Sequence, residues 1–142
     1  MIKNKIFWIC GLSWFIAQAI KVIIFFFQTK KIDLKLFFSS GGMPSSHSAF
    51  VSCLTTAIGL KNGFDCDLFA ICMVLSLIVM YDASGVRRAA GKQAAVINVI
   101  VENIESLGIK IDAKLKELLG HSPIEVFGGA ILGIIIAVCF FK

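Results

Sequence analysis

The residues best suited to chemistry gather at the start of an apolar segment, in the stretch Ser39–Phe50. Two glycines there permit a tight turn, and Pro44 suits the first turn of a helix. We therefore expect a helix that carries Ser45, Ser46 and His47 in its opening turn. Free backbone amides, hydroxyls and an imidazole at the positive end of a helix form an anion site, for phosphate above all.

A second histidine precedes another apolar segment, and a carboxylate follows it at helical spacing. Glu125 stands four residues after His121. The run Ser122–Glu125 has the pattern of a capping box with proline at the first helical position, which explains the glutamate without any chemistry. The alternative is that Glu125 orients the imidazole of His121 and raises its nucleophilicity. Both interpretations can hold at once.

Cations accompany both histidines. Arg88 and Lys92 are four residues apart, so they would share one side of a helix beside Arg87. Taken alone, these three would be ordinary residues of a cytoplasmic membrane flank. Lys21 interrupts an apolar run, where it either extends its amine to the membrane surface or turns inward toward a site.

The composition is that of an integral membrane protein. Of 142 residues, 58% are hydrophobic and only 16% are charged, and the mean hydropathy is +0.88. The net charge of +5 is spread over loops, which favours membrane-flanking segments and no nucleic-acid partner. The five cysteines are scattered through apolar runs as small hydrophobes without zinc spacing. We expect no metal and no cofactor.

The apolar segments predict an all-α membrane helical bundle of about four spans, plus one or two interfacial amphipathic helices, in a single domain over residues 1–142. The expected N-cap of the third span is Asp67, and Gly108 and Gly120 would end the two amphipathic helices. The spans are expected at about 6–27, 45–60, 68–81 with a continuation to 93, and 123–141, and the amphipathic helices at 94–107 and 112–119.

Alternating the direction of these spans brings the polar clusters together. The start of the second span, the end of the third and the start of the fourth then emerge on one side of the membrane. Those ends carry His47, the cluster Arg87, Arg88 and Lys92, and His121. The only two histidines of the chain therefore share a face with its densest basic cluster, which predicts a composite site.

These motifs resemble the type 2 phosphatidic acid phosphatase and vanadium haloperoxidase superfamily, in its divergent branch. Gly42–Ala49 is similar to the superfamily's Pro-Ser-Gly-His motif, with Ser46 in the glycine place. His121–Glu125 and the glycines after it resemble its His-x-x-x-Asp motif. The segment Tyr81–Ala94 is typical of the divergent branch.

The resemblance implies metal-independent hydrolysis of a phosphomonoester through a phosphohistidine. By motif, His121 would be the nucleophile, and Glu125 stands in the place of the supporting aspartate. His47 would protonate the leaving alcohol, while Ser45, Ser46 and nearby amides hold phosphate oxygens.

The chain also departs from the superfamily pattern. The lysine-and-arginine motif expected ahead of Pro-Ser-Gly-His is absent, and the arginine expected six residues before the nucleophile falls on Leu115. We expect the phosphate-binding cations to be supplied instead by Arg87, Arg88 and Lys92, with Lys21 as a further candidate.

The sequence thus predicts a membrane phosphatase that acts on a lipid phosphate or prenyl diphosphate, with membrane lipids and a phosphorylated amphiphilic substrate as its partners. The alternative is a non-catalytic membrane protein that binds or transports phosphorylated lipids.

Chain orientation follows from the positive-inside rule, which favours the cytoplasm for the site and the outside for both termini. The site side carries nine cations, against four on the other side: Lys30, Lys31, Lys35, Arg87, Arg88, Lys92, Lys110, Lys114 and Lys116 against Lys3, Lys5, Lys61 and Lys142.

Overall fold

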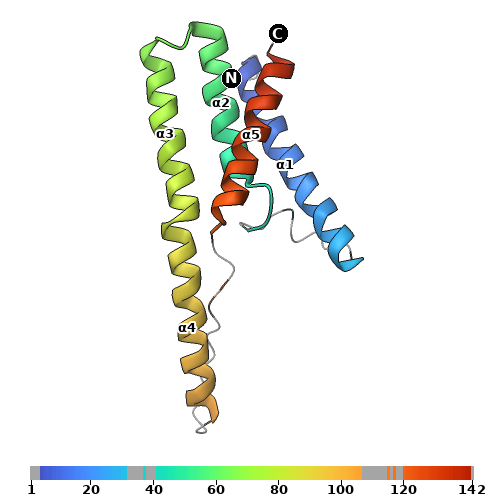
Figure 1. Cartoon of the computed structure of the whole chain (residues 1–142), viewed down its shortest axis with the longest axis vertical. Helices are drawn as coiled ribbons and strands as arrows, with labels where there is room; N and C mark the ends of the chain where they lie inside the picture. The colour runs from blue at the N-terminus through green and yellow to red at the C-terminus, as the bar shows by residue number, and fades with distance from the viewer. Residues whose placement is uncertain are drawn as a thin grey trace.

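The computed structural model describes residues 4–31, 37, 41–106, 115, 117 and 120–141. Every regular element among them is an α-helix, which confirms the predicted fold class (Figure 1). The helices are α1 (Lys5–Thr29), α2 (Ser46–Asn62), α3 (Asp67–Ser84), α4 (Val86–Ser106) and α5 (Pro123–Phe140). The expected helix over 112–119, its neighbour Gly108 and most of the charged loop after α1 fall outside the described residues.

The distribution of side chains suits a bilayer. Large apolar residues such as Trp8, Phe15 and Ile78 face outward, while small and polar residues such as Ser13 and Ser48 are buried. Hydrocarbon solvates large apolar side chains, so small residues that allow close helix packing are favoured inside. Three helices are long and apolar enough to cross a membrane, namely α1, the α3–α4 segment 67–104 and α5. The second expected span is the shorter helix α2.

Helix α2 forms the centre of the bundle, between α1, α3 and α5 (Figure 1). Gly129 and Gly133 of α5 lie directly against the backbone oxygens of Ser45 and Ala49 of α2. A glycine four residues after another gives a helix a flat face, which permits this close approach. On the side toward α3, the hydroxyls of Thr55 and Ser76 lie 2.7 Å apart and both donate to backbone carbonyls.

The apolar core lies at the end of the bundle that holds both termini. It is made by α1, the second half of α2 and the end of α5, with a contribution from α3; its buried members are Ile6, Ile9, Cys10, Cys53, Ala57, Ile58, Cys72, Ile136 and Ala137. All five cysteines are free thiols. The polar residues named by the sequence lie toward the opposite end.

Local capping places the helix starts, and two of the sequence predictions are wrong by one or two residues. Pro44 does not lie in the first turn of α2, because the helix begins at Ser46 and its N-cap is Ser45, whose hydroxyl accepts the N–H of Ser48 at 3.3 Å. Cys66, and not Asp67, is the N-cap of α3, and its Sγ accepts the N–H of Phe69. Ser122 caps α5 as predicted.

The amphipathic helix takes a direction that the sequence did not predict. It begins at Val86, and the N–H of Ala89 donates to the carbonyl of Gly85, whose own N–H donates to Tyr81. Because hydrogen bonds continue across the junction, α4 extends the axis of α3 beyond the rest of the bundle (Figure 1). The expectation was a separate helix over 94–107 that lies at the interface or caps the bundle.

Candidate active site

His121 lies where the start of α5 meets the junction between α3 and α4. Its backbone N–H donates to the carbonyl of Ala83 at 2.9 Å. Gly120 before it has φ of +83° and lies against the backbone of Arg87 and Arg88, so a side chain there would be both strained and obstructed. This close approach fixes the histidine beside the basic cluster.

The imidazole of His121 is buried and has no protein hydrogen bond. The residue is 3% exposed, and neither Nδ1 nor Nε2 has a hydrogen-bond partner among the described residues. A buried polar group without a partner costs free energy, and such groups are rare in folded proteins, where a catalytic role is one of the reasons for them. The histidine is therefore held by its backbone, with its ring nitrogens available.

Two cavities meet at His121. The larger, of about 400 Å³, is lined by the glycines before α2, by the basic side of α4 and by the start of α5; its charged members are Arg88, Lys92, Glu117 and Glu125. The smaller, of about 20 Å³, is lined by His121, His47, Asp82 and Arg87, with Val79 and Ala83. The predicted convergence of both histidines with the three cations is thus present in the fold.

Arg87 is held by a residue that the sequence analysis did not select. Its Nε donates to Oδ2 of Asp82 at 2.6 Å, and both side chains are partly exposed. This ion pair orients the guanidinium at the cavity that contains both histidines. The two residues are five apart and lie on either side of Gly85, where α3 ends and α4 begins. Side chains on one helix face are three or four residues apart, so the sequence carried no clear signal for this pair.

Lys21 is turned inward. It is 4% exposed, and the carbons of its side chain lie beneath Gly42, where a Cβ would come within 3.2 Å of them. Of the two interpretations left open by the sequence, extension to the membrane surface therefore does not describe this residue. Its ammonium contributes to the charge around His121 and Glu125.

Glu125 forms the capping box. Its Oε2 accepts the N–H of Ser122 at 2.9 Å, and its own N–H donates to the hydroxyl of Ser122. No hydrogen bond joins its carboxylate to His121, whose nitrogens have no partner among the described residues. The glutamate still acts on the site, because its carbonyl accepts the N–H of Ser45 at 3.0 Å and so ties the start of α5 to the start of α2.

The two serines of the first motif are buried at the start of α2 and do not line either cavity. Ser45 Oγ accepts hydrogen bonds from the N–H and the hydroxyl of Ser48. Ser46 is 1% exposed. These positions make both residues part of the helix start, where Gly129 of α5 lies against the carbonyl oxygen of Ser45.

Asn98 is a second residue that the sequence analysis missed. It is buried on α4, where its amide donates to the carbonyl of Leu115 and to Glu117, and its Oδ1 accepts the N–H of Leu115. These contacts hold Leu115 and Glu117 against α4. No signal in the sequence pairs Asn98 with a residue so far along the chain.

The environment of His121 favours a neutral imidazole. Burial lowers its pKa to about 4, the charge of Glu125 opposes the shift, and the charges of Lys21, His47 and Arg87 add to it. A neutral ring keeps a lone pair for bond formation at neutral pH. Among the described residues, no three histidine, cysteine or carboxylate side chains are grouped as metal ligands.

This pKa predicts a specific pH dependence. Between pH 6.5 and 4, the unfolded chain binds a proton at His121 that the folded protein does not, so stability falls by about 3 kcal/mol as the pH falls through this window. Histidine NMR in micelles without phosphate should show one imidazole titrating near pH 4, and that signal should be missing in His121→Asn. A midpoint near 6.5 for this ring would contradict the burial argument.

The all-helical bundle with apolar outward faces and a polar site around His121 is that of a membrane protein. Comparison of the sequence with known families then assigns the family. Residues 2–136 match the Divergent PAP2 family, so the chain belongs to this family. It is 47% identical over 131 residues to the uncharacterized membrane protein YuiD of Bacillus subtilis (strain 168), an alignment that covers 84% of this chain and 83% of that protein. No solved structure matches the chain.

Proposed function

We propose that the protein is a membrane phosphatase that hydrolyses a lipid phosphate or prenyl diphosphate through a phosphohistidine on His121. The observation that carries this proposal is the buried imidazole whose nitrogens have no partner among the described residues, placed between two cavities that contain arginine and lysine side chains. Family membership supports the reaction class.

The proposed reaction has two steps. A ring nitrogen of His121 forms a bond to phosphorus while the bond to the ester oxygen breaks, and protonated His47 gives its proton to the leaving oxygen. A water molecule, losing its proton to His47, then displaces the imidazole and releases phosphate. Arg87, Arg88, Lys92 and Lys21 are proposed to offset the charge that develops on the phosphoryl oxygens.

The test is phosphate release by the purified full chain from a panel of lipid phosphates and prenyl diphosphates. Vanadate should inhibit, because it mimics five-coordinate phosphorus at the nucleophile, and a chelator should leave the rate unchanged. Loss of activity with chelator, restored by a divalent ion, would exclude this mechanism. Tight binding of a phosphorylated lipid without any release would favour the alternative of a binding or transport protein.

We further propose that the site faces the cytoplasm, on the count of cations at the two membrane flanks. Both termini lie at the end of the bundle opposite the start of α5, so they would lie outside (Figure 1). Alkaline phosphatase fused after Lys142 should then be active, and a fluorescent reporter that folds only in the cytoplasm should be dark. The reverse pattern would place the site outside.

A further inference from the structure

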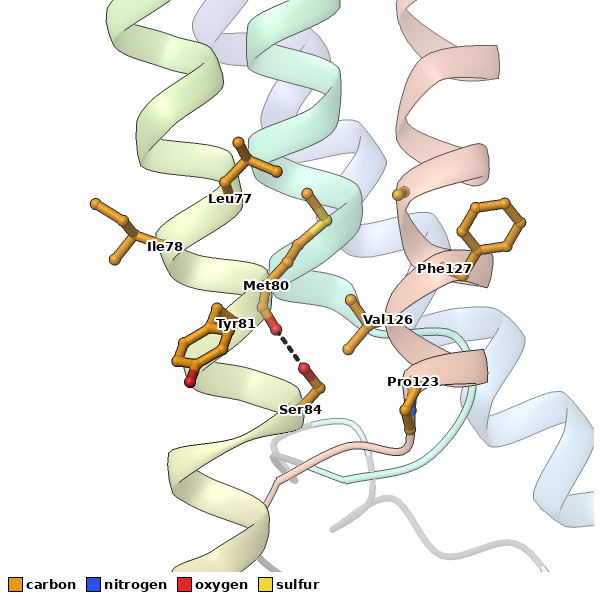
Figure 2. Close-up of a pocket in the computed structure, with 9 residues that line it drawn as sticks. Leu77, Ile78, Met80, Tyr81, Ser84, Pro123, Val126 and Phe127 are labelled. Atoms are coloured by element: carbon orange, nitrogen blue, oxygen red, sulfur yellow. Dashed lines mark hydrogen bonds between the residues drawn. The ribbon is translucent and has the colours of Figure 1, made fainter.

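An apolar groove runs along the bundle from the candidate active site. Its volume is about 730 Å³, and its walls are the end of α3 and the beginning of α5 (Figure 2). The lining includes Leu77, Met80, Tyr81 and Ser84 of α3, and Val126 and Phe127 of α5. We refer to it as the α3–α5 groove.

The groove begins beside His121. Pro123, at its lower end in Figure 2, is two residues beyond the histidine, and Ser84 follows the residue whose carbonyl accepts the N–H of His121. From these two residues the lining continues for seven residues along each helix, which is about 10 Å. One end of the groove therefore lies next to the polar site, although the groove and the two cavities share no lining residue among those described.

The chemistry changes sharply along this path. Arg87 and Arg88 lie just beyond the site end, whereas none of the described residues that line the groove is charged. Two side-chain hydroxyls of these residues line the groove, those of Tyr81 and Ser84. The hydroxyl of Ser84 already has a hydrogen-bond partner, because its Oγ donates to the carbonyl of Met80 at 2.9 Å (Figure 2). A ligand that fits both parts has an anionic head and a hydrocarbon tail.

The groove also faces the lipid. The side chains of Ile78, Tyr81 and Phe127 at its edges are exposed, and its two walls are helices that meet the length and composition of membrane spans. A chain in the groove could therefore continue into the bilayer without leaving an apolar environment. The length of about 10 Å covers only about a third of the hydrocarbon core.

We propose that the α3–α5 groove binds the first part of the hydrocarbon chain of the substrate whose phosphate lies at His121. This inference rests on the proposed function and deepens it, because it assigns the hydrocarbon chain of the phosphorylated lipid to one place in the fold. The position of the groove next to the site, together with the change from cations to apolar side chains, distinguishes this occupant from a bilayer lipid without a phosphate.

The first test compares two substrates with the same phosphate but a long and a very short chain, using the full chain in lipid nanodiscs. Ala130 lines the groove and Ile131 does not, although the two are neighbours on α5. Ala130→Phe should lower kcat/KM about tenfold or more for the long-chain phosphate and leave the short-chain rate unchanged. Ile131→Phe should alter neither. Equal losses for both substrates, or no loss for either, would overturn the inference.

The second test needs no turnover, so it separates failure of the groove from failure of the phosphatase. The probe is a long-chain alkyl phosphate with a diazirine near the phosphate, added to His121→Ala protein in nanodiscs. Labelling should concentrate on residues 77–84 and 123–130, and unlabelled alkyl phosphate should compete while the neutral alcohol should not. Even labelling of all lipid-facing helices, or equal competition by the alcohol, would reject the groove. Absence of phosphate release by wild-type protein would reject only the proposed function.

Discussion

Replacement of His121 with alanine is expected to lower phosphate release by about 1,000-fold or more, because the proposed covalent step loses its nucleophile. The same change should alter stability little. Alanine leaves a small cavity, but it also removes two buried nitrogens that have no hydrogen-bond partner among the described residues. Phosphate assays and thermal unfolding in the same detergent measure both effects.

The combination of these two readouts separates a catalytic role from a structural one. Large loss of activity with a melting temperature within a few degrees of wild type would support His121 as the reacting group. Activity that persists in the variant would exclude it. A matched control is Asn98→Ala, which removes the contacts of a buried side chain to Leu115 and Glu117 and should lower stability, since Asn98 is fully hydrogen-bonded.

The parts of the site that the sequence predicted depend on local rules or on span order. The start of α5 follows from residues Ser122–Glu125 alone, because a capping box is satisfied within one turn. The placement of His47 and His121 at the same end of the bundle follows from alternating spans, whereas their meeting in one cavity depends on how the helices pack. Neither inference needed any knowledge of side-chain contacts.

The missed parts depend on geometry that only the folded chain contains. The Asp82–Arg87 ion pair crosses the break at Gly85, so neither helix pattern predicts it. The inward direction of Lys21 depends on which face of α1 meets the loop at Gly42. The direction of α4 depends on hydrogen bonds that bridge the break, since an amphipathic pattern is equally compatible with a helix along the membrane surface.

The contact between α2 and α5 gives the second large effect, and two neighbouring glycines provide its test. A Cβ on Gly129 would overlap the carbonyl oxygen of Ser45, and this backbone cannot move without shifting the start of α2. Gly129→Ala should therefore cost about 1–3 kcal/mol and also lower activity, because the hydrogen bond from Ser45 to Glu125 crosses the same contact.

Gly128→Ala is not expected to lower the stability of the protein. Its Cβ would meet only the terminal methyl of Met43 at 3.3 Å, which can rotate away. Alanine is favoured over glycine within a helix by about 1 kcal/mol, so this variant should be as stable as wild type or slightly more so. Unfolding in a denaturing detergent, with phosphate release measured in parallel, would compare the two. Equal stability of the variants would mean that α5 does not approach α2 through Gly129, and the arrangement that brings Glu125 to Ser45 would then have to be abandoned.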